Sequence, residues 1–159
     1  MQHIMPNNSS FLAKTFQDWI HLMTNEAMEF VDITDQVASI IGQSGIRNGI
    51  VNVQTLHTTT AILINEHEPQ LLQDMKELLD RLAPKQASYR HDDFTVRTVN
   101  LVPEEVPNGH AHCRALFLRT SETINVAGGQ MDLGRWQRIF FMELDRPKQR
   151  TVSVLILGL

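Results

Sequence analysis

Two histidines, His110 and His112, stand two residues apart in a chain of 159 residues. They lie at the head of segment 112–119, whose pattern predicts a β-strand, so both imidazoles are expected on one face, about 6.5 Å apart at the backbone. Neutral imidazole is the commonest protein ligand for zinc and related ions, and a catalytic zinc usually takes three protein ligands and a water. The pair therefore indicates a metal site that needs a third ligand from elsewhere in the chain.

Two further histidines are the best-placed candidates for that ligand. His91 lies within the run Tyr-Arg-His-Asp-Asp, and His57 opens the run His-Thr-Thr-Thr. Asp92 or Asp93 is then expected to orient a ring from outside the ligand set. On composition alone, surface or hydrogen-bonded histidines are the commoner explanation of such residues.

Several other side chains could take part in chemistry at such a site. Arg114 would share the strand face of the two histidines and could bind a phosphate through two hydrogen bonds, although an ordinary surface ion pair is the alternative. Asn65 and Glu66 precede a strongly periodic helical segment, where capping of the helix is the simpler interpretation. Cys113 would point to the opposite strand face, as a small core residue.

The elements that must position these residues predict an α+β fold. Two helices are indicated, one from 34 to 41 that ends near Gly42 and Gly45, and one from 71 to 82 with apolar residues at helical spacing. Glycines 128 and 129 predict a hairpin, and 92–108 is irregular, as expected of a lid or site loop. The predicted strands are 30–33, 50–57, 61–64, 112–119, 123–126, 138–144 and 151–157. We expect one domain over residues 11–159 after a loose N-terminal tail, residues 1–10.

The composition excludes several classes of function. The formal net charge is −4 and the basic residues are scattered, so nucleic acid is not an expected partner. The longest apolar run, 154–157, is far shorter than the ~20 residues that span a bilayer. A single cysteine and the lack of a leader-like segment favour a cytoplasmic protein. Neither a nucleophile elbow nor a phosphate-binding Gly-Lys-Ser/Thr loop occurs.

The run from Ser121 to Ile139 resembles the signature of the YjbQ-like family, whose members are described as secondary thiamine-phosphate synthases. Arg135 stands where that family usually has threonine. The residues in register are Ser121, Ile124, Val126, Gly129, Gly134, Trp136, Gln137 and Ile139. Further matches are 57–59, 65–66, 74, 89–92, 108–112 and Glu143. The resemblance covers nearly all of residues 32–158.

The resemblance implies a single domain of mostly antiparallel sheet wrapped around helices, assembled as a homotrimer. It also implies that His57, His91 and His112 line one pocket, with His110 present in only part of the family. The implied reaction joins a pyrimidine-methyl diphosphate to a thiazole phosphate, so the expected partner is a small phosphorylated substrate.

We expect the ligands of a divalent metal ion to be His91 and His112, together with His57 or His110. Zinc suits imidazole best, whereas Mg²⁺ suits a diphosphate substrate. Arg114 is expected to bind phosphate, and Glu66 to act as an acid or base with Asn65 beside it. Two alternatives stay open: a zinc-dependent hydrolase of a small phosphorylated or acyl substrate, and a non-enzymatic trimeric metal- or ligand-binding module.

Overall fold

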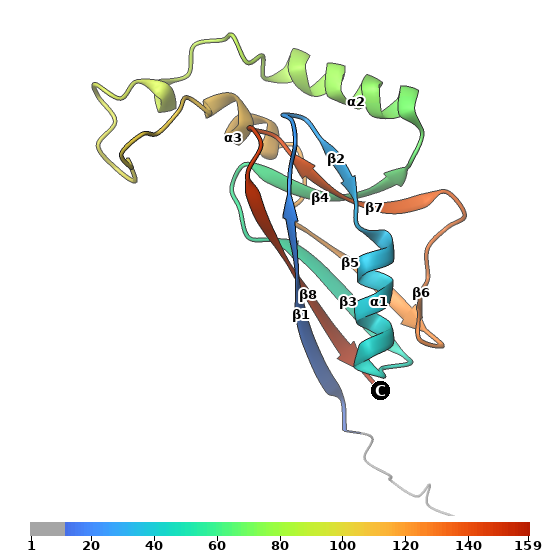
Figure 1. Cartoon of the computed structure of the whole chain (residues 1–159). Helices are drawn as coiled ribbons and strands as arrows, with labels where there is room; N and C mark the ends of the chain where they lie inside the picture. Colours follow the sequence, from blue (N-terminus) through green and yellow to red (C-terminus); the bar gives the residue numbers. More distant parts are fainter. Residues whose placement is uncertain (1–11) are drawn as a thin grey trace, which may run out of the picture.

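The computed structural model describes residues 12–159, so the predicted loose tail, residues 1–10, lies outside the described residues (Figure 1). One antiparallel sheet has five strands in the order β1 (Lys14–Met23), β8 (Gln149–Gly158), β3 (Gly49–Thr55), β5 (Ser121–Ala127) and β6 (Gln130–Met131). The other has three, in the order β2 (Phe30–Asp32), β7 (Gln137–Glu143) and β4 (Thr60–Glu66). The helices are α1 (Thr34–Ser44), α2 (Pro69–Leu82) and α3 (Gly109–Ala115), with a single 3₁₀ turn, η1 (Arg90–Asp92). The predicted α+β fold with mostly antiparallel strands is confirmed.

Two apolar clusters hold these elements in layers. The larger joins the inner face of the five-stranded sheet, including Val53 and Val154, to Ile40 of α1 and Phe141 of β7. The smaller lies on the other side of β7, where Met142 packs with Leu79 of α2 and Ala111 of α3. The three-stranded sheet is therefore buried on both faces, which explains the continuous apolar run of β7.

Helix α2 occupies the strongly periodic segment, as predicted, but its cap is a different residue. The Glu68 carboxylate accepts hydrogen bonds from the backbone N–H groups of Gln70 and Leu71, and Pro69 occupies the first turn. Asn65 and Glu66 lie in strand β4 instead, so the interpretation of these two residues as helix caps is wrong.

The segment predicted as a strand over 112–119 begins as a helix, and this is the most consequential correction. Asp92 Oδ1 accepts hydrogen bonds from the backbone N–H groups of Asn108 and Gly109, which fixes the start of α3. A Cβ on Gly109 would lie 2.5 Å from the Cβ of Tyr89, so only glycine allows this approach. Short-range alternation in the sequence cannot reveal an anchor supplied from sixteen residues away.

Two smaller differences concern Cys113 and the N-terminal region. Cys113 is exposed, because the helical phase buries Ala111 and Arg114 and turns the thiol outward, so its assignment to the core is wrong. Strand β1 was not predicted, although Phe16, Ile20 and Leu22 alternate with polar residues along it.

The predicted glycine turn is confirmed, and so is the irregular course of the segment before α3. Gly128 and Gly129 have φ values of 62° and 84° and close the tight turn between β5 and β6. Residues 93–108 contain no helix or strand. Among the described residues, 12–159, no helix is both long and apolar enough to cross a membrane.

Candidate functional site

A cleft of about 400 Å³ lies where α3 meets the irregular segment 93–108. His91 and His112 both line it, together with side chains from the connection between β3 and β4 and from the turn between β7 and β8. The remaining lining residues are Thr58, Arg97, Asn100, Val102, Glu104, Glu105, Asn108, Arg146 and Lys148. Segments far apart in sequence are thus brought to one place at the end of the molecule that carries α3 and η1 (Figure 1).

The rings of His91 and His112 pack edge to face, with centroids 4.6 Å apart and an interplanar angle of 60°. Burial first, and then the neighbouring His91, lower the pKa of His112 below its ordinary value of 6.5. Both effects disfavour a positive charge on His112, so its neutral form, which can accept a proton or bind a cation, is favoured at neutral pH.

Arg97 and Glu105 hold His91 in place. Arg97 Nη1 donates to His91 Nε2 at 3.2 Å and to Glu105 Oε1 at 2.6 Å. The hydrogen bond from Arg97 lowers the pKa of Glu105, which is therefore ionised. Because arginine only donates, this hydrogen bond uses the lone pair of His91 Nε2.

Two further cations extend the cleft beyond the imidazoles. Arg146 Nη1 and Lys148 Nζ contact the Oδ2 atom of Asp145, at 3.0 and 2.9 Å. Asp145 is almost fully buried, whereas the two cationic side chains are about one-third exposed. One carboxylate therefore fixes two cations that still reach solvent, so these three side chains together carry one net positive charge that can attract an anion.

His57 lies next to the cleft without lining it. Its Nε2 accepts a hydrogen bond from the backbone N–H of Thr151 at 2.9 Å, which uses that lone pair. Burial and then the charge of Arg150 lower its pKa, with Glu143 opposing the shift. Arg150 and Glu143 form a buried ion pair beneath this ring. His57 thus ties strand β8 to the connection that carries Thr58.

His110 and Arg114 lie on the other side of α3, so the prediction that they share a face with His112 is wrong. Residues two apart on a helix point about 200° apart, whereas residues four apart share a side. His110 is 3% exposed, and its Nε2 has no hydrogen-bond partner among the described residues. Burial and then the charge of Arg114 lower the pKa of His110. Asn108 Oδ1 is buried and unpartnered in the same way.

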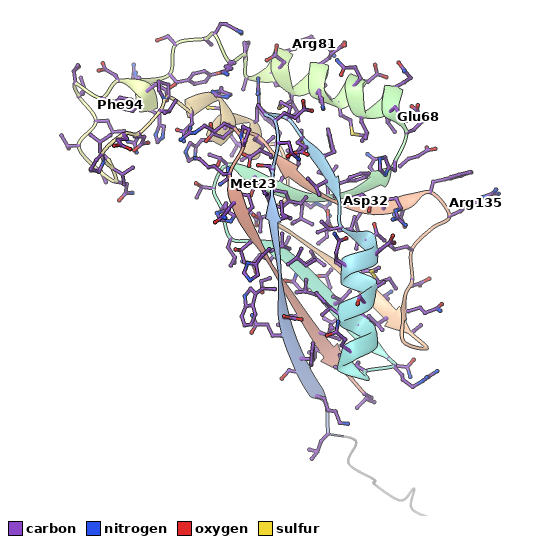
Figure 2. All side chains as sticks on the ribbon, in the orientation of Figure 1. Met23, Asp32, Glu68, Arg81, Phe94 and Arg135 are labelled. Carbon is purple, nitrogen blue, oxygen red and sulfur yellow. The ribbon has the colours of Figure 1, made fainter. Side chains whose placement is uncertain are left out.

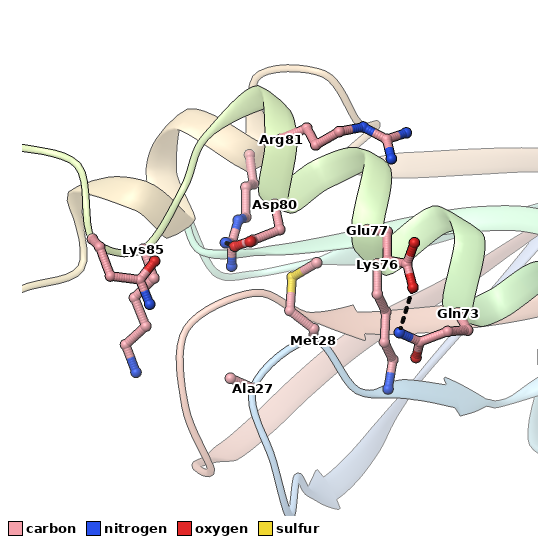
Figure 3. A pocket seen from close by; sticks show the side chains of 10 residues that line it. Ala27, Met28, Gln73, Lys76, Glu77, Asp80, Arg81 and Lys85 are labelled. Atoms are coloured by element: carbon pink, nitrogen blue, oxygen red, sulfur yellow. Dashed lines mark hydrogen bonds and ion pairs between the residues drawn. The ribbon is translucent and has the colours of Figure 1, made fainter.

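Arg114 faces a separate cleft of about 530 Å³ between α2 and the connection from β1 to β2 (Figure 3). Its Nε donates to the carbonyl of Ala83 and its Nη2 to Asp80, at 3.0 and 2.5 Å. Arg114 is 2% exposed, and its guanidinium ties α3 to the last turn of α2. Arg114 therefore does not reach a ligand bound between His91 and His112.

Asn65 and Glu66 are also remote from the imidazoles. Strand β4 begins at Thr60, which pairs with Glu143 near the cleft, and ends at Glu66, which pairs with Gln137. Six residues of strand separate these ends by about 20 Å. Figure 2 shows Arg135, beside that far end, projecting on the opposite side of the molecule from Phe94 of the irregular segment. There Arg135, the departure from the family threonine, stacks on the Trp136 ring at 4.6 Å.

The structure thus brings together two of the four predicted metal ligands. Within residues 12–159 no three side chains of His, Cys, Asp or Glu converge closely enough to hold an ion. His91 and His112 suit a metal as two imidazoles in contact, but among the described residues they lack a third ligand.

Sequence reasoning missed the cations Arg97, Arg146 and Lys148. Residues 146–148 form the turn Arg-Pro-Lys between two predicted strands, which places two cations at one sheet end. Arg146 and Lys148 could therefore have been predicted from the sequence. Arg97 could not, because its position depends on the course of an irregular segment.

The fold and the cleft define an α+β protein with an imidazole pair set among cations at one end of its sheets. The chain belongs to the UPF0047 protein YjbQ-like family, whose model matches residues 18–159. A UPF0047 protein of Methanothermobacter thermautotrophicus is 43% identical over 86% of this chain and 88% of its own length. One from Bacillus subtilis is 29% identical over 87% of this chain and 97% of its own.

Solved structures show the same fold. A crystal structure from Sulfolobus solfataricus P2, described as a YbjQ-like protein of unknown function, is 36% identical with a TM-score of 0.83. It covers 93% of this chain and all of that one. A hypothetical protein from Aeropyrum pernix K1 is 33% identical with a TM-score of 0.80, and the match covers 91% of this chain and 99% of that one.

Proposed function

We propose that this chain is an enzyme acting on a small phosphorylated substrate, which it binds in the cleft beside His91 and His112. The reaction we favour joins a pyrimidine-methyl diphosphate to a thiazole phosphate. One observation carries the proposal: a contacting pair of imidazoles lines the same cleft as Arg97, Arg146 and Lys148. Imidazoles and cations in one cleft suit a substrate that is anionic and gains charge on a departing group.

In this proposal, Arg146 and Lys148 bind the phosphate. Both reach solvent while Asp145 fixes their direction, so little side-chain entropy is lost when an anion arrives. The planar guanidinium of Arg146 can donate two parallel hydrogen bonds to phosphate oxygens, and Lys148 adds a point charge.

The chemical step needs charge stabilisation above all. The bond from the methylene carbon to the diphosphate oxygen breaks, and a bond from that carbon to the thiazole nitrogen forms. The electron pair of the broken bond stays on the diphosphate, so negative charge grows where Arg146 and Lys148 lie. Cations fixed in advance by Asp145 stabilise that charge without reorganising during the reaction.

A divalent ion is the second part of the proposal. His91 and His112 would hold it, and substrate oxygens and water would complete the set that one chain leaves open. When bound, the ion supplies further positive charge to the diphosphate. Because Arg97 donates to His91 Nε2, metal binding at that atom requires Arg97 to turn toward Glu105 alone.

One observation also favours a hydrolase. A neutral, half-buried His112 can accept a proton from an attacking water, which suits hydrolysis of a phosphorylated substrate. The two reactions differ in their requirement for the thiazole phosphate, so a product assay separates them.

The assay uses the purified full chain, the pyrimidine-methyl diphosphate, and the thiazole phosphate either present or absent. We expect thiamine phosphate and diphosphate only when both substrates are present, and a loss of about 100-fold in kcat/KM for His112→Ala. His21→Ala, a histidine on strand β1 that does not line the cleft, should retain wild-type turnover. Turnover without the thiazole phosphate would support the hydrolase, and no turnover of either kind would contradict the enzyme proposal.

The metal is tested by elemental analysis of the same variants after equilibration with zinc. We expect bound zinc in the wild type and in His110→Ala, and its loss in His112→Ala. Unchanged metal content in His112→Ala would contradict the proposed ligands. The homotrimer is also part of the proposal, and the mass of the native protein in solution checks it.

A further inference from the structure

Residues 94–107 form one wall of the imidazole cleft, yet they contribute nothing to the core. Figure 1 shows this loop, in yellow before α3, projecting away from both sheets. Its aliphatic side chains face solvent: Val96 is 73% exposed, Val99 70% and Val102 59%. None of its apolar side chains packs in either apolar cluster. A segment with so few buried apolar contacts opens at a small cost in free energy, so polar contacts must hold it in place.

Arg97 holds the loop in one shape from within. Its Nη1 donates to Glu105 Oε1 at 2.6 Å and its Nη2 to the carbonyl of Asn100 at 2.8 Å. Glu105 Oε2 also accepts from the backbone N–H of Val102 at 3.3 Å. Asn100 and Glu104 have φ values of 53° and 65°, a backbone conformation that persists only where the surrounding contacts fix it. The loop is therefore a preformed unit that can move without losing its own structure.

The ends of the loop are pinned together, and its interior is tied to the site at one place. Asp92 Oδ1 accepts from the backbone N–H groups of Asn108 and Gly109, at 2.9 and 2.8 Å. Apart from Asp93, where the loop starts, residues 94–107 have one hydrogen-bond partner elsewhere among the described residues, which is His91. Arg97 Nη1 donates to both Nε2 and the carbonyl oxygen of His91, at 3.2 Å each.

We propose that residues 94–107 are a flap, latched shut by Arg97 on His91, and that a divalent cation at His91 Nε2 opens it. This inference rests on the metal binding proposed above and describes how that binding controls the cleft. One lone pair cannot serve a metal and a hydrogen bond at once. A zinc–nitrogen bond is about 2.0–2.1 Å long, so the ion would occupy the space of the 3.2 Å hydrogen bond and repel the guanidinium.

Opening changes the charge of the cleft in favour of an anion. Arg97, Glu104 and Glu105 line the cleft from the flap and together carry one net negative charge, which leaves when the flap moves. Arg146 and Lys148 stay, because Asp145 fixes them outside the flap. Loading of the metal thus removes one wall and leaves a more positive cleft for the phosphorylated substrate.

The test is a distance between two spin labels, measured by pulsed electron paramagnetic resonance on the full chain with and without zinc. One label is placed at Val99→Cys on the flap and the other at Leu78→Cys on α2, both at exposed positions. Cys113→Ser removes the exposed native thiol, and dilution with unlabelled chains restricts the signal to distances within one chain. We expect zinc to shift the mean distance by more than about 2 Å, the size of loop rearrangements on binding.

A variant tests the latch without any metal. His91→Phe keeps an aromatic ring beside His112 but removes the accepting nitrogen, so the zinc-free variant should show the shifted distance. His21→Phe, on β1 and outside the cleft, is the matched control and should keep both the wild-type distance and the response to zinc. Circular dichroism confirms that each variant is folded.

Elemental analysis of the same samples separates failure of the flap from failure of the metal site. Bound zinc with an unchanged distance, or a folded His91→Phe variant with the wild-type distance, overturns the flap and leaves the metal proposal standing. Absence of bound zinc overturns the metal proposal and opening by a cation, and the His91→Phe distance then decides whether the latch exists.

Discussion

The two sides of helix α3 both carry basic side chains, but one side lines a cleft and the other is buried. On one side His112 meets His91 in a cleft whose cations reach solvent. On the other side Arg114 is buried, with Asp80 and the carbonyl of Ala83 as its partners. His112 and Arg114 are only two residues apart, yet His112 can contact a ligand whereas Arg114 holds α3 against α2.

The difference shows which polar groups are free to do chemistry. Arg114 and the Glu143–Arg150 pair are already satisfied within the protein, so they contribute to the fold. Arg146 and Lys148 of the cleft are fixed by the buried Asp145 and remain about one-third exposed to solvent. Charge type alone therefore does not identify the site, whereas burial and partners do.

The largest expected effect is on stability, from the buried side of α3. Arg114→Met removes two hydrogen bonds to a buried guanidinium and should lower the free energy of unfolding by about 2 kcal/mol, measured by urea denaturation. Arg81→Met, on the exposed side of the same helix end as Asp80, should change it by less than about 0.5 kcal/mol. Neither substitution should change the affinity for diphosphate. A clear loss of affinity in Arg114→Met would contradict the conclusion that Arg114 lies apart from the ligand site.

The next effect concerns ligand binding at the cleft. Lys148→Ala should weaken diphosphate binding about tenfold, roughly 1.4 kcal/mol, as measured by calorimetric titration, because a cation facing the ligand is lost. Lys76→Ala is the matched control, since Lys76 is comparably exposed and paired with Glu26 but lies outside the cleft. Equal affinities in the two variants would contradict the assignment of the anion site.

A smaller effect separates the structural His57 from the cleft. Its pKa in the folded protein is lowered from 6.5, by burial and then by Arg150, so only the unfolded chain binds the proton readily. Stability should therefore fall as the pH decreases below about 6.5 and show no slope from this group above it. His57→Gln should reduce that slope in urea denaturation between about pH 7.5 and 5.5. A slope identical to wild type would show that His57 is not held neutral.

The smallest expected effect tests the helical phase of α3. Cys113 is exposed, so Cys113→Ser should change the free energy of unfolding by less than about 0.5 kcal/mol. The native thiol should react with a thiol reagent without denaturant. A thiol that reacts only after unfolding would contradict the helix. It would favour the strand predicted from the sequence, in which His110 and His112 share a face.

Much of the fold could be predicted because it depends on local periodicity. Helix α2 and the strands β7 and β8 follow from apolar spacing, and the turn at Gly128 and Gly129 follows from the ease with which glycine adopts a positive φ. Helix α3 could not be predicted in that way, since Asp92 anchors it from a distant part of the chain. Because this segment is a helix and not the predicted strand, Arg114 lies away from the predicted site.

The candidate site was predicted in part for the same reason. His91 and His112 were identified by residue type and come together in the structure, although their roles stay proposals. The partner of His57 is Thr151, which is 94 residues away, and the position of Arg97 depends on a contact with Glu105 within the irregular segment. No spacing rule encodes such contacts.

The most direct test of the central claim is to follow the histidine ring signals by nuclear magnetic resonance while diphosphate is added to ring-labelled protein. The account predicts that the His91 and His112 signals shift together along one saturable curve, while those of His110 and His57 move little. Shifts confined to other histidines, or none at saturating diphosphate, would contradict a ligand site built on this imidazole pair.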